Sequence, residues 1–226
     1  MPNRLLPPAL LAMALSFTAC DVTKSVAPRP EDRQPASVVP LAASAAPVIV
    51  ATAPIGPFPG SGSGISGVAT LTRSQNGLFV HQEVAGLTPG HAYSVWWVIF
   101  DNPQGCATST CVPSDLGVRA AQGSLVNGGG FVAEGTTQTY SSHLARHDVE
   151  GKQVQMGDPS GVDNTYRSQV HLVLRAHGVA EPSAENQAIQ TSTFNGFCNL
   201  PPDPPGVCQN VSAAVFTAAD APGQGS

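Results

Sequence analysis

Residues 87–100, LTPGHAYSVWWVIF, constrain the fold of this chain more than any other stretch. The Pro89-Gly90 pair is typical of a turn, because proline presets the first corner and glycine accepts positive φ at the second. The apolar run that follows is rich in aromatic and β-branched residues, which favours a strand. It is too short to cross a bilayer as a helix, which needs about 20 apolar residues. We therefore predict that it is the central strand of a β-sheet.

Successive side chains of this strand point to opposite faces of the sheet. Both faces are then largely apolar, so the strand should be covered on both sides or lie beside an apolar groove. Trp96 and Trp97 are adjacent and point in opposite directions. Two interpretations stay open: both belong to the core, or one of them lines a ligand groove, since recognition sites favour tryptophan. Trp96 is our candidate for the ligand contact.

Short segments of strand composition recur along the chain, mostly separated by turn signals. Asn76-Gly77 predicts one hairpin, and the run Asn127-Gly128-Gly129-Gly130 predicts a second. A short helix is expected at 182–189, and segment 136–163 holds either a strand near 152–156 or a helical turn at 144–148. The other expected strands are 68–73, 78–84, 93–99, 121–126, 131–135, 169–177 and 211–217. This pattern predicts an all-β fold, a two-sheet antiparallel Greek-key sandwich of immunoglobulin-like plan.

The composition excludes one class of partner. The 226 residues carry a formal charge of −5, only 11% of them are charged, and Lys24 and Lys152 are the only lysines. A nucleic-acid-binding protein would present a basic patch, so no nucleic-acid partner is expected. We also expect no cofactor.

The N-terminal 20 residues have the composition of an export leader. Arg4 supplies a positive start, an apolar stretch follows, and small residues precede Cys20. This segment resembles a bacterial lipoprotein signal, in which the cysteine is acylated and becomes the new N-terminus. The resemblance implies a lipid on Cys20, a membrane as partner and a place in the bacterial cell envelope. The alternative is an ordinary secretory signal and a secreted protein.

The segment after the leader reads as a tether. Residues 21–64 are rich in Pro, Ala, Ser and Gly and cannot bury enough apolar surface to order themselves. We therefore divide the chain into a signal (1–20), a disordered linker (21–64), a β-sandwich domain (65–218) and a disordered tail (219–226). Residues 48–51 are a short apolar run that could instead pack on the domain.

The cysteine count agrees with the lipid assignment. An odd thiol in an exported protein needs an explanation, and lipidation of Cys20 leaves four cysteines. Four cysteines allow three pairings in an oxidising compartment. We favour the local pairs Cys106–Cys111 and Cys198–Cys208, because each brackets a loop rich in Pro, Gly or Ser. A zinc site of four cysteines is the alternative, although the two-residue spacing of zinc knuckles is missing.

The segments GVATL (67–71) and VAGLTPGHAY (84–93) are similar to the opening strands of copper/zinc superoxide dismutases and the related CHRD-type domains. The resemblance implies a superoxide dismutase-like Greek-key sandwich. In the dismutases the strand after this turn carries a His-x-His pair that binds copper. Ser94 and Trp96 stand at those positions here, so the resemblance implies the fold and argues against dismutase activity.

The strand at 169–177 carries the best candidates for a site. His171, Arg175 and His177 share one face with Val173, while the opposite face is wholly apolar. Such a row could hold a carboxylate or phosphate, because the arginine fork fits both. The two histidines are roughly 20 Å apart at about 3.3 Å per residue, too far to share a metal. The alternative is a solvated strand face with Arg175 paired to an acid.

A second pair of histidines gives the alternative metal site. His143 and His147 are four residues apart and would share a face on a helix. The segment lacks the His-Glu-x-x-His pattern, which favours a surface loop. The oxygen-rich segment 158–164 has too few ligands at fixed spacing for a calcium loop and is expected to be a turn.

These observations favour a cell-envelope lipoprotein whose β-sandwich has a non-catalytic binding or structural role and an unidentified protein or small-molecule partner. One alternative is a metal-binding protein or metalloenzyme of superoxide dismutase-like ancestry. Another is a module that binds a carbohydrate or a small acid through Trp96, Arg175 and His177.

Overall fold

The computed structural model describes residues 47–157, 159–198 and 208–218. Most of the predicted linker, Cys20 and the predicted tail lie outside these residues. The regular structure of the described part is mostly strands, with one α-helix and three short 3-10 helices between residues 103 and 121. The strands are β1 (Ile49–Pro57), β2 (Ser66–Ser74), β3 (Gly77–Ala85), β4 (His91–Phe100), β5 (Gly123–Val132), β6 (Thr137–Ala145), β7 (Val154–Gly157), β8 (Gln169–Val179) and β9 (Gln209–Phe216), and the helix is α1 (Ala184–Ser192).

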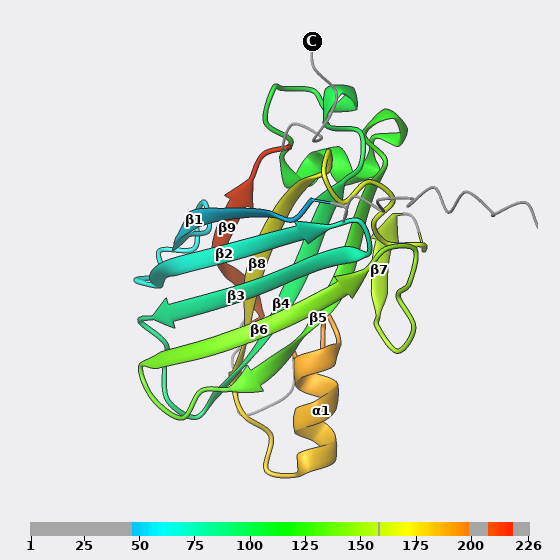
Figure 1. The fold of residues 1–226 in the computed structure, drawn as a ribbon. Coiled ribbons are helices and arrows are strands. Elements are labelled where there is room, and N and C mark those ends of the chain that lie inside the picture. The colour runs from blue at the N-terminus through cyan, green and yellow to red at the C-terminus, as the bar shows by residue number, and fades with distance from the viewer. Residues whose placement is uncertain (1–46, 158, 199–207, 219–226) are drawn as a thin grey trace, which may run out of the picture. The chain divides into compact units, whose positions relative to one another are not determined.

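The strands form one curled antiparallel sheet in the order β6-β3-β2-β1-β9-β8-β4-β5-β7. Figure 1 shows β2, β3 and β6 crossing in front of β8, β4 and β5, and the main hydrophobic core lies between these two halves. The prediction of an all-β chain is confirmed. The arrangement as two separate Greek-key sheets is not, because β1 pairs with β2 over Ile49–Ile55 and then with β9 at Gly56 and Pro57. One strand thus joins the two halves.

Strand β1 corrects the predicted domain boundary, since the disordered linker was expected to reach residue 64. Ala53 and Ile55 are buried in the core, while Val50 and Pro54 are exposed on the other face. This alternation is sufficient for a half-buried strand. Proline normally excludes a strand from a sheet interior because it lacks an N–H. Pro54 is tolerated because this part of β1 forms a ladder on one side only, with β2.

Strand β4 is buried on both faces, as the sequence predicts, and lies between β5 and β8. Trp97 belongs to the main core and its Nε1–H donates to Ser142 Oγ over 3.1 Å. Trp96 belongs to a second, smaller cluster on the outer face of the same strand. The two adjacent tryptophans therefore anchor two different layers.

The predicted hairpin at residues 127–130 is wrong, because β5 continues through this run as one strand. The glycines are there because neighbouring groups approach the backbone too closely for a side chain. A Cβ on Gly128 would lie 2.9 Å from Trp97 Nε1, and one on Gly130 would lie 2.7 Å from the Thr191 carbonyl oxygen. Close approach, rather than turn formation, explains this glycine run.

The remaining expectations are mostly confirmed. The Asn76-Gly77 signal marks the hairpin between β2 and β3, and the strands expected near residues 152–156, 169–177 and 211–217 are β7, β8 and β9. Helix α1 starts after Ser183, whose Oγ accepts a hydrogen bond from the Asn186 N–H. The alternative of a helical turn at 144–148 is wrong, because Leu144 is buried within β6. No helix in the described ranges has the length and apolar character needed to span a membrane.

Candidate functional site

The candidate site lies on the outer face of β4 and β8. Trp96 pairs with Val173, and Ser94 pairs with Arg175, across these strands. Trp96 and Arg175 therefore lie on the same face of the sheet. This face is not solvated, because loop residues cover it and form the second hydrophobic cluster. The buried members of that cluster are Trp96, Val98, Phe100, Cys111, Ala121, Leu125 and Val173.

A groove of about 270 Å³ opens between this cluster and its covering loops. Its lining is mainly apolar, with amide side chains at one end. Met156 is 50% exposed, whereas the floor, which includes Trp96, Val98 and Val173, is buried. The groove is lined by Phe58, Trp96, Val98, Pro113, Leu116, Leu125, Gln155, Met156, Val173, Phe194, Asn195 and Asn210. A concave apolar surface with a few polar groups is the usual form of a small-molecule site.

Trp96 forms a rigid floor. Its Nε1–H donates to Ser94 Oγ over 2.7 Å, and its ring meets Phe194 edge-to-face with centroids 5.1 Å apart. The indole N–H is therefore satisfied inside the protein, and the fully buried ring closes the bottom of the groove. Ser94 and Trp96 stand where the superoxide dismutases have two copper-binding histidines. Their side chains hydrogen-bond to one another and offer no imidazole, so they do not fit a copper site.

Arg175 is not itself a lining residue; it lies behind Phe194, Asn195 and Asn210, which do line the groove, and is 9% exposed. Its Nε donates to the Phe194 carbonyl over 2.7 Å, and Nη1 donates to Asn210 Oδ1 over 3.0 Å. The guanidinium also stacks over the Phe194 ring, 4.0 Å from its centroid. In the described part of the chain no carboxylate pairs with it. The expectation of a solvated face is thus wrong, and among the described residues Arg175 has no acid partner.

His177 lies behind the groove and is fully buried. Its Nδ1 donates to the Gly196 carbonyl over 3.1 Å, so the neutral ring carries its proton there and Nε2 accepts from Ser94 Oγ over 2.7 Å. Burial lowers the pKa of His177 to about 4. The positive charge of Arg175 lowers this pKa further, whereas the hydrogen bond to Gly196 raises it. His177 therefore positions Ser94 and, through it, Trp96, and does not reach a ligand.

His171 is separated from the groove. Its Nε2 accepts from the Gln169 amide over 2.6 Å, and its ring packs edge-to-face on Phe100. Gln169 also binds the Cys111 backbone through both ends of its amide. Burial lowers the pKa of His171 to about 4. The predicted row is thus divided: Trp96 and Arg175 both pack against Phe194, a lining residue of the groove, whereas the histidines support loops on either side of it.

The four cysteines of the domain form the two disulfides favoured by the sequence, Cys106–Cys111 and Cys198–Cys208. The alternative of a four-cysteine zinc site is therefore wrong. Each disulfide lies next to a buried side chain of β8. Cys208 Sγ lies 3.4 Å from His177 Nδ1, and the Cys111 backbone is held by Gln169.

His143 and His147, the alternative metal-binding pair, do not lie on one face of a helix as their four-residue spacing predicted. His143 is exposed on strand β6, and His147 lies beyond the end of that strand, so the helical face that they were to share does not exist. In the described part of the chain neither histidine belongs to a group of three possible ligands. The geometry gives this alternative no support.

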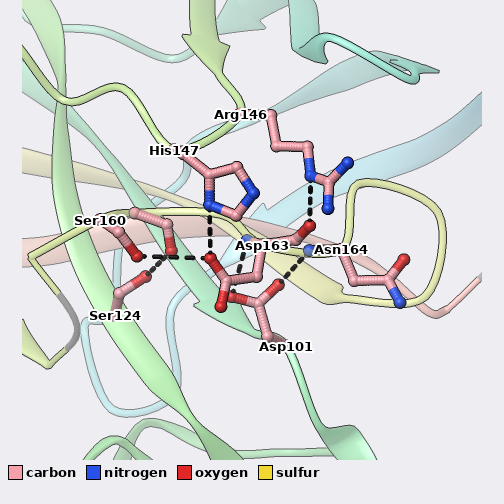
Figure 2. A network of polar contacts seen from close by, with 8 residues as sticks. Asp101, Ser124, Arg146, His147, Ser160, Asp163 and Asn164 are labelled. Atoms are coloured by element: carbon pink, nitrogen blue, oxygen red, sulfur yellow. Dashed lines mark hydrogen bonds and ion pairs between the residues drawn. The ribbon is translucent and has the colours of Figure 1, made fainter.

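His147 instead belongs to a polar network around Asp163, which Figure 2 shows. His147 Nδ1 lies 2.8 Å from Asp163 Oδ1, and Ser160 Oγ lies 3.3 Å from the same oxygen. In a catalytic triad the imidazole stands between the hydroxyl and the carboxylate. Here the carboxylate stands between the other two, so the arrangement does not activate a serine.

The second carboxylate in Figure 2 has a structural role. Asp101 accepts hydrogen bonds from the backbone N–H groups of Asp163 and Asn164, over 3.1 and 3.0 Å. Arg146 Nε donates to the Asp163 carbonyl over 2.6 Å. These bonds fix the loop before β8 to the end of β4, and the turn expected in this segment is present.

The chain matches no protein-family model, no curated protein and no solved structure. The site must therefore be interpreted from its own geometry. Sequence reasoning identified Trp96 and Arg175, but it missed the groove residues that come from loops and strand ends, such as Phe58, Phe194 and Asn210. Their sequence neighbourhoods carry no periodic signal that would have placed them against β4.

Proposed function

We propose that this protein is a cell-envelope lipoprotein with a non-catalytic domain that binds a small, largely apolar ligand in the groove over Trp96. The groove itself is the observation that carries the proposal. Its floor is closed, apolar and held by internal hydrogen bonds, which lowers the ordering cost of binding. None of the described residues that line it carries a hydroxyl, thiol or imidazole, and this lining favours binding over a reaction that needs a nucleophile or a general base.

The proposed location rests on the leader and on the disulfides. A cysteine preceded by an apolar stretch and small residues supports lipidation at Cys20. Two disulfides support an oxidising compartment outside the cytoplasm. In this proposal the lipid holds the chain at a membrane while the groove collects ligand from its surroundings.

Substitution of Met156 by Glu tests the groove. We expect at least tenfold weaker binding of the neutral fluorescent probe N-phenyl-1-naphthylamine, because a carboxylate would be desolvated against the apolar lining. Probe fluorescence in a titration of the full-length chain measures this. Val50→Glu is the matched control, since Val50 is similarly exposed but lies on β1 in the other half of the sheet. Equal probe binding by the wild type and M156E would contradict a ligand site here.

Substitution of Cys20 by Ser tests the anchor. In a bacterial host that processes lipoproteins, we expect the wild type in the membrane fraction and C20S mostly in the soluble fraction, because acylation needs the thiol. Incorporation of labelled palmitate gives the second readout and should be lost in C20S. Thr23→Ser, a change of similar size close to the cysteine, serves as control. A C20S protein that stays membrane-bound would refute lipid anchoring.

A further inference from the structure

Three amide side chains at the edge of the groove are oriented by their neighbours. The Oδ1 atoms of Asn195 and Asn210 accept from Nη2 and Nη1 of Arg175, over 3.4 and 3.0 Å. The Oε1 of Gln155 accepts from Gln153 Nε2 over 3.0 Å. Each amide therefore has its acceptor occupied, and its NH₂ group donates to no residue that the structure describes. Since all three line the groove, the edge offers hydrogen-bond donors.

Positive charge lies at the same end. Arg175 uses three of its five N–H groups, and all its described partners are neutral oxygens of Phe194, Asn195 and Asn210. Because it is largely buried, its charge is screened less than that of a surface arginine. An edge built of donors, beside a cation with which no carboxylate among the described residues pairs, is complementary to an oxyanion.

We propose that the groove selects an amphipathic carboxylic acid, with the hydrocarbon chain over Trp96 and the carboxylate at the Asn195, Asn210 and Arg175 end. This inference rests on the proposed function, since it names the ligand class of the same groove. The volume of about 270 Å³ is at the small end for ligand sites, which suits a medium chain better than a long one.

Octanoate and 1-octanol form a matched pair of probes, because they share a chain length and differ in the head group. Transfer from water alone favours the neutral alcohol, since a carboxylate is costly to desolvate. A preference for the acid must therefore come from the donor edge and the Arg175 charge. Titration calorimetry of the full-length chain at pH 7.5, below the micellar range, should show octanoate binding at least tenfold more tightly, about 1.4 kcal/mol.

Asn210→Asp changes the charge at the proposed carboxylate end of the groove while nearly preserving the shape of the side chain. It keeps an oxygen for Arg175 Nη1 but supplies an internal carboxylate and removes two N–H donors. We expect it to abolish the preference for octanoate and to leave octanol binding within twofold. Gln155→Glu is the second variant, since its side chain is exposed and folding is not at risk. It should weaken octanoate at least fivefold through like-charge repulsion, with octanol again unchanged.

The outcomes distinguish the two proposals. If octanoate and octanol bind equally, or if the preference survives in both variants, the acid selection is wrong and the groove stands as an apolar site. If neither probe nor N-phenyl-1-naphthylamine binds, the proposed function fails with it. An acid preference that disappears in both variants supports the inference.

Discussion

Acidification from pH 7.5 to 4.5 is expected to lower the free energy of unfolding by about 5 kcal/mol. Two buried histidines are the cause, because burial lowers the pKa values of His171 and His177 from 6.5 to about 4. Below pH 6.5 the unfolded chain binds protons that the folded protein does not. The contribution is thus present above pH 6.5 and is lost as pH falls towards 4, at about 1.4 kcal/mol per pH unit for each histidine.

The hydrogen bonds of the two rings explain why protonation is resisted. His177 Nε2 accepts from Ser94, which in turn accepts from Trp96, so a second ring proton would meet a hydroxyl that already points at it. His171 Nε2 accepts from the Gln169 amide and has the same conflict. Protonation would therefore weaken the loop contacts on both sides of the groove as well as the core.

Urea unfolding at four pH values between 4.5 and 7.5 measures this effect. His171→Gln and His177→Gln should each remove about half of the pH dependence, because the amide keeps polar atoms but does not titrate. His143→Gln, a change at an exposed histidine, is the control. Two results would contradict the assignment of this pH dependence to His171 and His177. One is a fall of less than 1 kcal/mol in the wild-type free energy of unfolding between pH 7.5 and 4.5, and the other is an unchanged pH dependence in both glutamine variants.

The central strand was predictable because its own residues decide its environment. Apart from Ser94, both faces of residues 93–99 are apolar, so no choice of partner changes the conclusion that this strand is covered on both faces. Strand β8 was predictable for a related reason: its apolar face is unbroken, and alternation fixes which residues share the other face. What alternation cannot give is whether that other face meets water or a loop.

The errors at β1 and β5 have a common physical cause. In both segments the local residues favour a loop, and tertiary contacts override that preference. These residues are Pro54 in β1 and the three consecutive glycines at 128–130 in β5. Pro54 is accepted where the strand has only one partner in its ladder, and the glycines are required where Trp97 and Thr191 approach the backbone. Neither condition can be deduced before the neighbours are known.

The candidate site was predictable in its fixed part only. Trp96 and Arg175 lie on regular strands, so strand periodicity placed them on one face. The donors come from Gln155, Asn195 and Asn210, which lie in three separate segments, and only the folded chain brings them to one edge. The orientation of their amides depends on Gln153 and Arg175, and no sequence pattern reports it.

Replacement of Arg73 by Met is expected to lower the free energy of unfolding by about 4 kcal/mol. Arg73 is 1% exposed and holds three backbone carbonyls: Nη1 donates to Thr165 and Ser168, and Nη2 donates to Thr217. Burial lowers its pKa to about 10, so it remains charged at neutral pH. Methionine fills most of the volume but leaves these carbonyls without the guanidinium, at about 1–3 kcal/mol for each one left unsatisfied.

The position of these bonds in the fold explains the size of the expected effect. Arg73 comes from β2 in one half of the sheet, whereas Thr165 and Ser168 precede β8 and Thr217 follows β9 in the other half. The side chain thus ties the two halves together beside the core. Urea unfolding at pH 7.5 measures the loss, and Arg119→Met, at an exposed arginine, is the control. The free energy of unfolding of Arg73→Lys should lie between those of the wild type and R73M, because one ammonium group cannot reproduce the guanidinium fork. A loss below 1 kcal/mol for R73M would show that these carbonyls find other donors and that the core alone joins the halves.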